Sequence, residues 1–312
     1  MVAFANSYNW ILLFFCILSI AAISGMFTER AGIVNIAVNG MMIFGALGYL
    51  MFSHHFLGET NPWLVIPATL AGVLFGAVAS LIFGFAVIKL KSSQTISGFA
   101  FNLLAVGIAL IFLTIFGDAK KLQNTFHNLE FAIAEKNQIW SVPIISFPLV
   151  CTILVIVLSY LFLYKTPWGL RFRSIGENPQ AADVAGIKVN NIKWQSVIIS
   201  GALSGLAGAF FAQSTTTGKI NFNGDVAGFG YLALSIMIMG QWNVLLIALS
   251  TLLFSVLLGI SYSVAFFGEN LAKISDLFEV APYFLTLLIV IAMSKRSKAP
   301  AAAGIPYDKS TR

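Results

Sequence analysis

The sequence predicts an all-α, polytopic integral membrane protein with about nine transmembrane or re-entrant helices. Of its 312 residues, 58% are hydrophobic and only 10% are charged, and the mean hydropathy is +0.89. Soluble globular chains carry roughly 25% charged residues. The composition therefore excludes that class, and the apolar residues are gathered into runs of helix length.

These charge-free runs give the predicted number of helices. A helix needs about 20 apolar residues to cross the hydrocarbon core of a bilayer, and fewer where it is re-entrant. The nine runs are 8–27, 33–52, 64–88, 95–117, 143–164, 194–213, 226–240, 244–265 and 280–294. Run 226–240 is short and contains glycine, which favours a broken helix surrounded by protein or a water-filled cavity. We expect one transmembrane domain, residues 1–294, and a poorly ordered tail, residues 295–312.

One polar stretch, Lys165–Lys193, interrupts the apolar runs with five basic and two acidic residues, and it must lie in water. Near its centre, Asn178 is a favourable N-cap, Pro179 suits the first helical position and Gly186 suits the left-handed residue that ends a helix. A short capped helix with small apolar residues can insert into the groove of another protein. An ordinary solvated loop explains the same spacing equally well.

The basic residues also predict the orientation in the membrane. Cytoplasmic loops carry an excess of Lys and Arg. With Lys165–Lys193 in the cytoplasm and alternating spans, thirteen of the eighteen basic residues lie inside. The N-terminus is then outside and the C-terminus cytoplasmic. The largest outer loop, 118–142, is long enough for a surface helix that meets an extracellular partner, or for a lid without one.

Four amide side chains inside the runs are candidates for a translocation path: Asn35, Asn39, Asn102 and Gln213. A buried amide must be satisfied by neighbouring helices or by a hydroxylated substrate and its water. Interhelical bonding is the commoner role for any single residue, whereas several amides near glycine-flanked short helices indicate a path for a polar, uncharged solute. Gly201 and Gly205 form a G-x-x-x-G, which predicts close helix packing.

Several classes of function find no support in the sequence. The three histidines lack partners at metal-ligand spacing, and no catalytic constellation is present, so we predict neither an enzyme nor a metal site. The middle of each run lacks charge, which argues against a proton-coupled pump or voltage sensor. Without a G-x-x-x-x-G-K-[ST], active transport needs energy from another subunit. Because the basic residues flank apolar runs, we predict no nucleic-acid partner.

Two segments resemble a known family: Thr28–Leu50, TERAGIVNIAVNGMMIFGALGYL, and Ile175–Ala209, which contains GENPQAADVAGI. They are similar to permease subunits of bacterial ABC importers, in the branch that serves ribose, other simple sugars and nucleosides and is related to branched-chain amino-acid permeases. Gly228–Asn243, Ala281–Ile291 and the terminal AGIPYDKSTR add to a resemblance that covers nearly the whole chain. The pattern E-R-x-G-x-x-N-I-x-x-x-G-M and the terminal G-x-P-Y point most closely to the nucleoside and simple-sugar type.

The resemblance implies a multi-pass subunit of the bacterial plasma membrane that imports nucleosides by alternating access and binds no cofactor itself. Its partners would be an ATPase that binds ATP–Mg, a second and longer permease in a heterodimer, an extracellular substrate-binding lipoprotein and membrane lipid. The alternatives are a permease for a ribose-like sugar or for a vitamin such as riboflavin, a stand-alone secondary transporter or channel, and a structural assembly subunit.

The resemblance also assigns residues. The stretch GENPQAADVAGI would be the coupling helix that docks in the ATPase, and the matching positions are Glu177, Asn178, Ala181, Ala182 and Gly186. One departure is Asn39, which stands where a Glu is common in the family. This difference removes a carboxylate and leaves the role of that site open.

Overall fold

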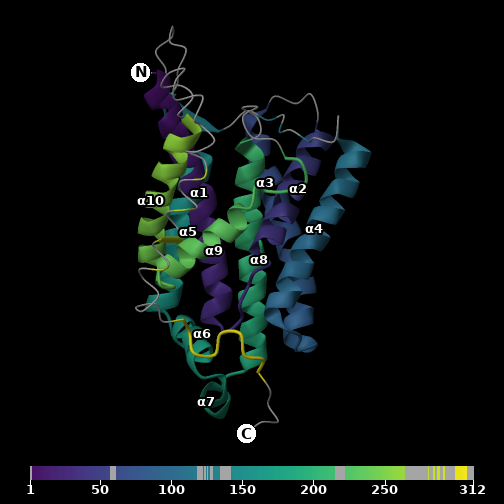
Figure 1. The fold of residues 1–312 in the computed structure, drawn as a ribbon, viewed down its shortest axis with the longest axis vertical. Helices are drawn as coiled ribbons and strands as arrows, with labels where there is room; N and C mark the ends of the chain where they lie inside the picture. The colour runs from purple at the N-terminus through teal and green to yellow at the C-terminus, as the bar shows by residue number, and fades with distance from the viewer. Residues whose placement is uncertain are drawn as a thin grey trace.

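The computed structural model describes residues 2–56, 61–117, 142–214, 222–263 and 299–307, with shorter stretches between 122 and 133 and between 280 and 291. Seven long helices run side by side along the vertical axis of Figure 1. They are α1 (Val2–Arg30), α2 (Val38–His55), α3 (Val65–Gly84), α4 (Gln94–Phe116), α5 (Phe147–Lys165), α8 (Val189–Ser214) and α10 (Val244–Ser263). Three short helices are α6 (Pro167–Glu177), α7 (Pro179–Val184) and α9 (Phe229–Met239).

The described residues contain six helices that are long and apolar enough to cross a membrane, which makes the chain a polytopic membrane protein. These helices are α1, α3 with its flanking turns η1 (Pro62–Leu64) and η2 (Phe85–Lys89), α4, α5, α8 and α10. Helix α2, with 18 residues, is not among these six, and run 226–240 forms only the short α9. Run 280–294 lies largely outside the described residues, so the predicted total of nine is not reached in this part of the chain.

The all-α prediction needs one correction, at loop 118–142, which the distribution of basic residues predicts to lie outside. Strand β1 (Glu130–Ile133) pairs antiparallel with β2 (Val142–Ser146), and Phe131 lies opposite Ile145. Our suggestion of a surface helix there was wrong for these residues. Leu129, Phe131 and Ile133 alternate with other residues at a period of two, which is the strand period and not the helical one.

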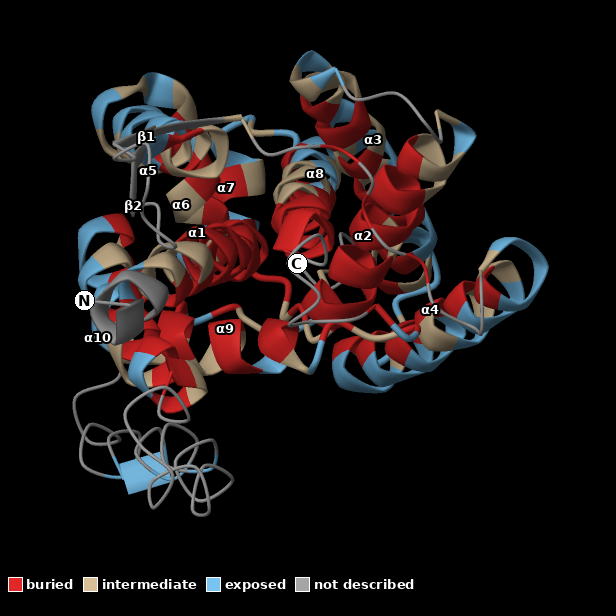
Figure 2. Ribbon diagram, turned by 90° about the horizontal axis from the view of Figure 1, so that it is seen from above, coloured by how far each residue is buried: buried red, intermediate tan, exposed pale blue. Residues whose placement is uncertain are grey.

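The core lies where α1, α2 and α8 meet. Seen from above in Figure 2, these helices are mostly buried, while α4, α5 and α10 show exposed outer faces. The exposed residues on those faces are largely apolar; Leu103 on α4 is 75% exposed and Leu249 on α10 is 71% exposed. Apolar side chains turned outward along whole helices suit contact with lipid.

Helices α2, α3 and α8 approach one another through glycines. A Cβ atom added at Gly205 of α8 would lie 2.6 Å from the carbonyl oxygen of Gly72, and one added at Gly72 would lie 2.7 Å from the carbonyl oxygen of Gly45. Both neighbours are backbone atoms, so no side-chain movement could make room. The close packing predicted from Gly201 and Gly205 is confirmed, because a Cβ atom at Gly201 would lie 2.7 Å from the carbonyl oxygen of Gly76 on α3.

We predict that Gly205→Ala lowers the thermal stability of the purified protein, because the new methyl group forces α3 away from α8. Overpacking of this kind costs about 1–3 kcal/mol. The matched control is Gly107→Ala on α4, where a Cβ atom meets nothing within 4 Å. Thermal unfolding in detergent, followed by circular dichroism, compares the two. Equal melting temperatures would show that the glycine contact does not limit stability.

Candidate functional site

Helix α9 begins midway along the length of the long helices (Figure 1). It has only 11 residues, and it crosses obliquely at mid-height between the long helices in Figure 1. The backbone just before it is left-handed at Ala227 (φ 53°) and Gly228 (φ 69°), which turns the chain into the helix. Run 226–240 therefore forms a short helix, as its length and glycines suggested. The first N–H groups of any helix lack partners within it, and at this depth other residues must supply them.

Asn39 of α2 supplies one of these partners. Its side-chain oxygen accepts a hydrogen bond from the backbone N–H of Gly230 at 3.1 Å, and its Nδ2 donates to Oδ1 of Asp225 at 3.0 Å. A Cβ atom at Gly230 would lie 2.6 Å from the backbone nitrogen of Asn39. The amide therefore attaches the start of α9 to α2 at a point where only glycine fits.

Asn102 joins α4 to the same place. Its side-chain oxygen accepts from the backbone N–H of Gly40 at 2.8 Å, while its Nδ2 donates to the carbonyl oxygen of Ile36 at 3.0 Å and to the hydroxyl of Tyr231 at 2.9 Å. Asn102 is buried although α4 is largely exposed. One side chain thus bonds to both the start of α2 and the first turn of α9.

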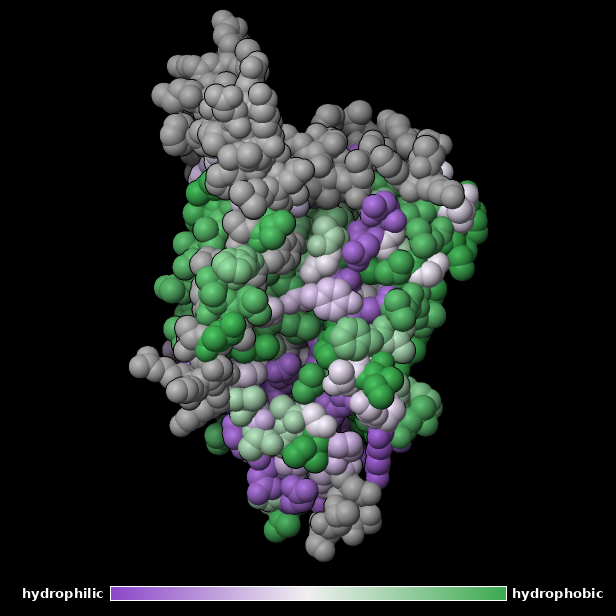
Figure 3. Space-filling model, viewed as in Figure 1, coloured by the Kyte–Doolittle hydropathy of each residue, from purple (hydrophilic) through white to green (hydrophobic). Residues whose placement is uncertain are grey.

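We call Asn39, Asn102, Asp225 and Tyr231 the α9 polar cluster. Asp225 is half-buried and Tyr231 is 40% exposed, so the cluster is accessible from one side of the molecule. Figure 3 shows hydrophilic residues on this side among hydrophobic ones. Carboxylates inside a membrane normally face a water-filled cavity or another protein surface and not lipid. This side therefore suits a solute path or a subunit contact.

The structure separates the other two predicted path residues from this cluster. Asn35 donates to the hydroxyl of Ser200 at 2.9 Å and accepts from the N–H of Ala37 at 3.0 Å. Gln213 donates to the hydroxyl of Thr69 at 3.0 Å, joining α8 to α3. Both side chains are buried, and each bonds to a neighbouring segment of the chain. Sequence reasoning missed Tyr231; the signal was a polar aromatic residue beside the glycines that open α9.

The last two residues of α1 hold the turn between α9 and α10. The guanidinium of Arg30 donates two hydrogen bonds to the carbonyl oxygen of Trp242, at 3.0 and 2.8 Å, and the indole N–H of Trp242 donates to the carboxylate of Glu29. Gln241 and Trp242 both have positive φ angles, so the turn is held in a conformation that non-glycine residues rarely adopt. These hydrogen bonds give a structural role to Glu29 and Arg30, the E-R pair of the sequence pattern.

Helix α7 has the ends that the sequence predicts. The side chain of Asn178 accepts from the backbone N–H of Ala181 at 3.0 Å, Pro179 occupies the first turn, and Gly186 is left-handed with φ 85°. Of the proposed coupling residues, Ala182 is buried against the rest of the chain, whereas Glu177, Asn178, Ala181 and Gly186 are exposed. Ala182 therefore holds α7 in place, and the outward surface includes Val184, which is 76% exposed.

The end of α6 is fixed by α1 and by the tail. A Cβ atom at Gly176 would collide with the carbonyl group of Arg30, and the carbonyl oxygen of Gly176 accepts from the N–H of Ala302 at 2.9 Å. The tail passes below the helices as the yellow segment of Figure 1. We expected a poorly ordered tail, and for residues 299–307 this was wrong: Tyr307 also lies beside Lys193, with 5.9 Å between the ammonium and the ring centre.

One protein-family model matches most of this chain. The model of the family described as "Branched-chain amino acid transport system / permease component" matches residues 8–293. The chain belongs to this permease family.

Two relatives of the permease are 34% identical to it. One is the nucleoside ABC transporter permease protein NupC of Lactococcus lactis subsp. cremoris, where the match covers 93% of this chain and 92% of the relative. The other is the guanosine ABC transporter permease protein NupQ of Bacillus subtilis, with 95% and 94% covered. The ribose import permease protein RbsC of Bacillus subtilis is 24% identical, with 92% of each chain covered. No solved structure matches the permease.

We predict that Asn102→Leu destabilises the permease markedly. The substitution leaves the N–H of Gly40 without its bond and removes the donor to Ile36, and each buried polar group left unpaired costs about 1–3 kcal/mol. Thr114→Val is the matched control on the same helix, because the Thr114 hydroxyl donates only to carbonyl oxygens of α4 itself. Thermal unfolding of both variants in detergent measures the difference. If both variants lower the melting temperature by a similar, small amount, Asn102 does not hold α4 in place.

Proposed function

We propose that this permease is the membrane-spanning subunit of an ABC importer that moves nucleosides into the cell by alternating access. The observation that carries this proposal is the 34% identity, over more than nine-tenths of both chains, to permeases named for nucleosides and for guanosine. The ribose permease is a more distant relative over a similar length. A simple-sugar substrate is therefore the alternative.

The α9 polar cluster supports a path for a neutral solute that carries hydroxyl groups and an aromatic base. The amides of Asn39 and Asn102 already bond within the protein, so they position the other two residues. The carboxylate of Asp225 can accept hydrogen bonds from the hydroxyls of a sugar. The partly exposed ring of Tyr231 can stack on a nucleobase, as aromatic rings do on nucleic-acid bases.

We predict that Asp225→Asn raises the half-saturating concentration for guanosine uptake about tenfold, because a hydrogen bond to a charged group contributes about 1.5–3 kcal/mol. Tyr231→Phe keeps the ring and should bind guanosine better than Tyr231→Ala does. Uptake of labelled guanosine by cells that carry each variant, with unlabelled ribose and other nucleosides as competitors, gives these values. Competition by ribose alone would favour the sugar alternative.

The proposed partners follow from the exposed polar and cytoplasmic surfaces. A second, different permease would cover the side that carries the α9 polar cluster, since that side suits lipid poorly. An ATPase that binds ATP–Mg would bind the outward surface of α7, and an extracellular substrate-binding lipoprotein would deliver the solute. The permease itself would contribute no catalytic residue. It would reside in the bacterial plasma membrane as one transmembrane domain, residues 1–294, with the tail 295–312.

A chain of contacts connects α7 to the α9 polar cluster. Helix α7 follows α6 directly, and Gly176 at the end of α6 packs on the carbonyl group of Arg30. The side chains of Glu29 and Arg30 hold Trp242, which lies in the turn after α9. A displacement of α7 by the ATPase would therefore move the end of α1 and tilt α9. This movement would change access to Asp225 and Tyr231.

We predict that Val184→Asp abolishes nucleoside uptake and the recovery of the ATPase with the permease, because it places a charge in an apolar contact. Val184→Ala, which keeps a small apolar side chain, should retain both. The measurements are labelled-nucleoside uptake and co-purification from mild detergent. Full ATPase recovery with Val184→Asp would place the contact elsewhere. Uptake driven by an ion gradient without any ATPase would overturn the ABC importer itself.

The proposed orientation places the N-terminus outside and the C-terminus in the cytoplasm. His55 at the end of α2 and Gln180 on α7 are both exposed, and they lie toward opposite ends of the molecule. We predict that an impermeant thiol reagent labels His55→Cys in intact cells and labels Gln180→Cys only after the cells are broken. The native Cys16 is buried and Cys151 lies within α5, so neither should react. The reverse pattern would show the opposite orientation.

A further inference from the structure

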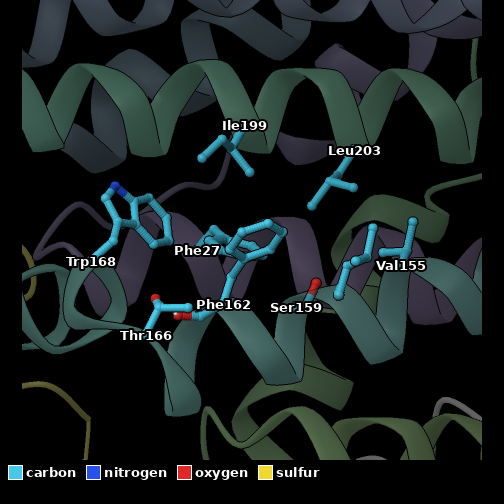
Figure 4. A pocket seen from close by; sticks show the side chains of 9 residues that line it. Phe27, Val155, Ser159, Phe162, Thr166, Trp168, Ile199 and Leu203 are labelled. Carbon is cyan, nitrogen blue, oxygen red and sulfur yellow. Dashed lines mark hydrogen bonds between the residues drawn. The ribbon is translucent and has the colours of Figure 1, made fainter.

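A cavity of about 510 Å³ opens between α5 and α8, with α1 as its floor. Figure 4 shows Ile199 and Leu203 of α8 facing the side chains of α5 across it, with Phe27 between them. Helix α5 packs on α1 and α10 and makes little direct contact with α8. The cavity is thus a gap left between two membrane-spanning helices of the same chain.

The lining of the cavity suits an apolar occupant. Six of its nine lining side chains are aliphatic or phenyl groups. Of the other three, the indole N–H of Trp168 already donates to Gln195 at 3.1 Å, and the hydroxyl of Thr166 donates to the carbonyl oxygen of Phe162 at 2.6 Å. A polar ligand would therefore find few partners in this cavity.

The length of the cavity matches one half of a bilayer. Its lining on α5 extends from Val155 to Thr166, at the end of that helix. At 1.5 Å per residue this is about 16 Å. Half of the hydrocarbon core is about 15 Å thick. The cavity thus extends from the α6 end of the membrane span to near its middle, which is the depth of one acyl chain.

The cavity opens on the side of the molecule away from the α9 polar cluster. In Figure 2, α5 and α8 lie toward the upper edge, and α9 lies toward the lower edge. The outer face of α5 around the opening is apolar; Leu154, Leu158 and Phe162 are 54%, 40% and 50% exposed. Lipid, and not the proposed second permease, therefore covers this side.

Two cations lie close in the chain to the residues that line the α6 end of the cavity, one of which is Trp168. Lys165 ends α5, three residues after Phe162, and Arg171 lies three residues after Trp168 on α6, so each shares a helix face with a lining residue. Both cations are exposed. Indole rings and basic side chains at the end of a span are typical of the membrane interface, where basic residues attract anionic lipid headgroups.

We propose that this cavity is a binding site for an anionic phospholipid. One acyl chain lies between α5 and α8 down to Val155, and the headgroup phosphate lies beside Lys165 and Arg171. The lipid comes from the leaflet on the side of α6 and α7. It fills the space that separates α5 from α8, next to α6, the helix that leads into α7. The inference rests on the membrane placement of the helices and does not depend on which solute is transported.

The test uses the full-length permease in nanodiscs with a trace of phosphatidylglycerol that carries a photoreactive group near the end of one acyl chain. After irradiation, mass spectrometry locates the label. We expect it on the α5 and α8 residues that line the cavity. Ser159→Phe and Leu203→Trp fill the cavity from opposite walls and should each remove this label. Leu249→Trp, on the exposed face of α10, is the matched control and should leave it unchanged.

The headgroup is tested with the same photoreactive chain on phosphatidylcholine. Each cation near an anionic membrane surface favours binding about fivefold, so Lys165→Gln and Arg171→Gln should each weaken phosphatidylglycerol labelling by that factor and leave phosphatidylcholine labelling unchanged. Equal labelling by both lipids would overturn the anionic headgroup. Label spread evenly over α4, α5 and α10, or cross-linking of Leu203→Cys to a second permease chain, would overturn the site.

Discussion

The structure depends on one constraint: a helix that begins inside a membrane must find hydrogen-bond partners for its first N–H groups there. Helix α9 begins at Phe229, between other helices and far from either end of the long spans. No water in the hydrocarbon core could satisfy its first turn. Asn39 accepts from the N–H of Gly230, and the N–H groups of Phe229 and Tyr231 bond to the carbonyl oxygens of Val226 and Gly228. Asn39 also bonds to Asp225, and Asn102 bonds to the hydroxyl of Tyr231, so the two amides hold these side chains at the accessible surface.

The glycine packing of α2, α3 and α8 makes this arrangement possible. Asn39 can reach α9 only if α2 is held in one position, and the backbone contact of Gly45 and Gly72 with α8 holds it there. The opposite end of the molecule is fixed by polar contacts instead. Glu29 and Arg30 hold Trp242, and the carbonyl group of Arg30 packs on Gly176. The turn after α9 and the end of α6, which leads into α7, are therefore attached to the same helix, α1.

Much of the fold could be predicted from apolar runs, because a helix needs about 20 apolar residues to cross the hydrocarbon core of a bilayer. The ends of α7 were equally predictable, since Asn178, Pro179 and Gly186 act within a few residues of themselves. The strand at Glu130–Ile133 and the packing of Ala302 on Gly176 were not foreseen. The alternation of apolar residues in the strand was visible, whereas the packing of the tail depends on a distant glycine.

The sequence by itself determined that the chain crosses the membrane, where its helices lie and which permease family it resembles, because composition, periodicity and motifs are properties of the chain. Only the tertiary structure decided which amides act together. Asn35, Asn39, Asn102 and Gln213 look alike in the sequence, yet Asn39 and Asn102 meet at α9 while the other two join α8 to its neighbours. The partners of a buried amide are set by the helices that cross beside it, and those crossings bring together residues far apart in the chain.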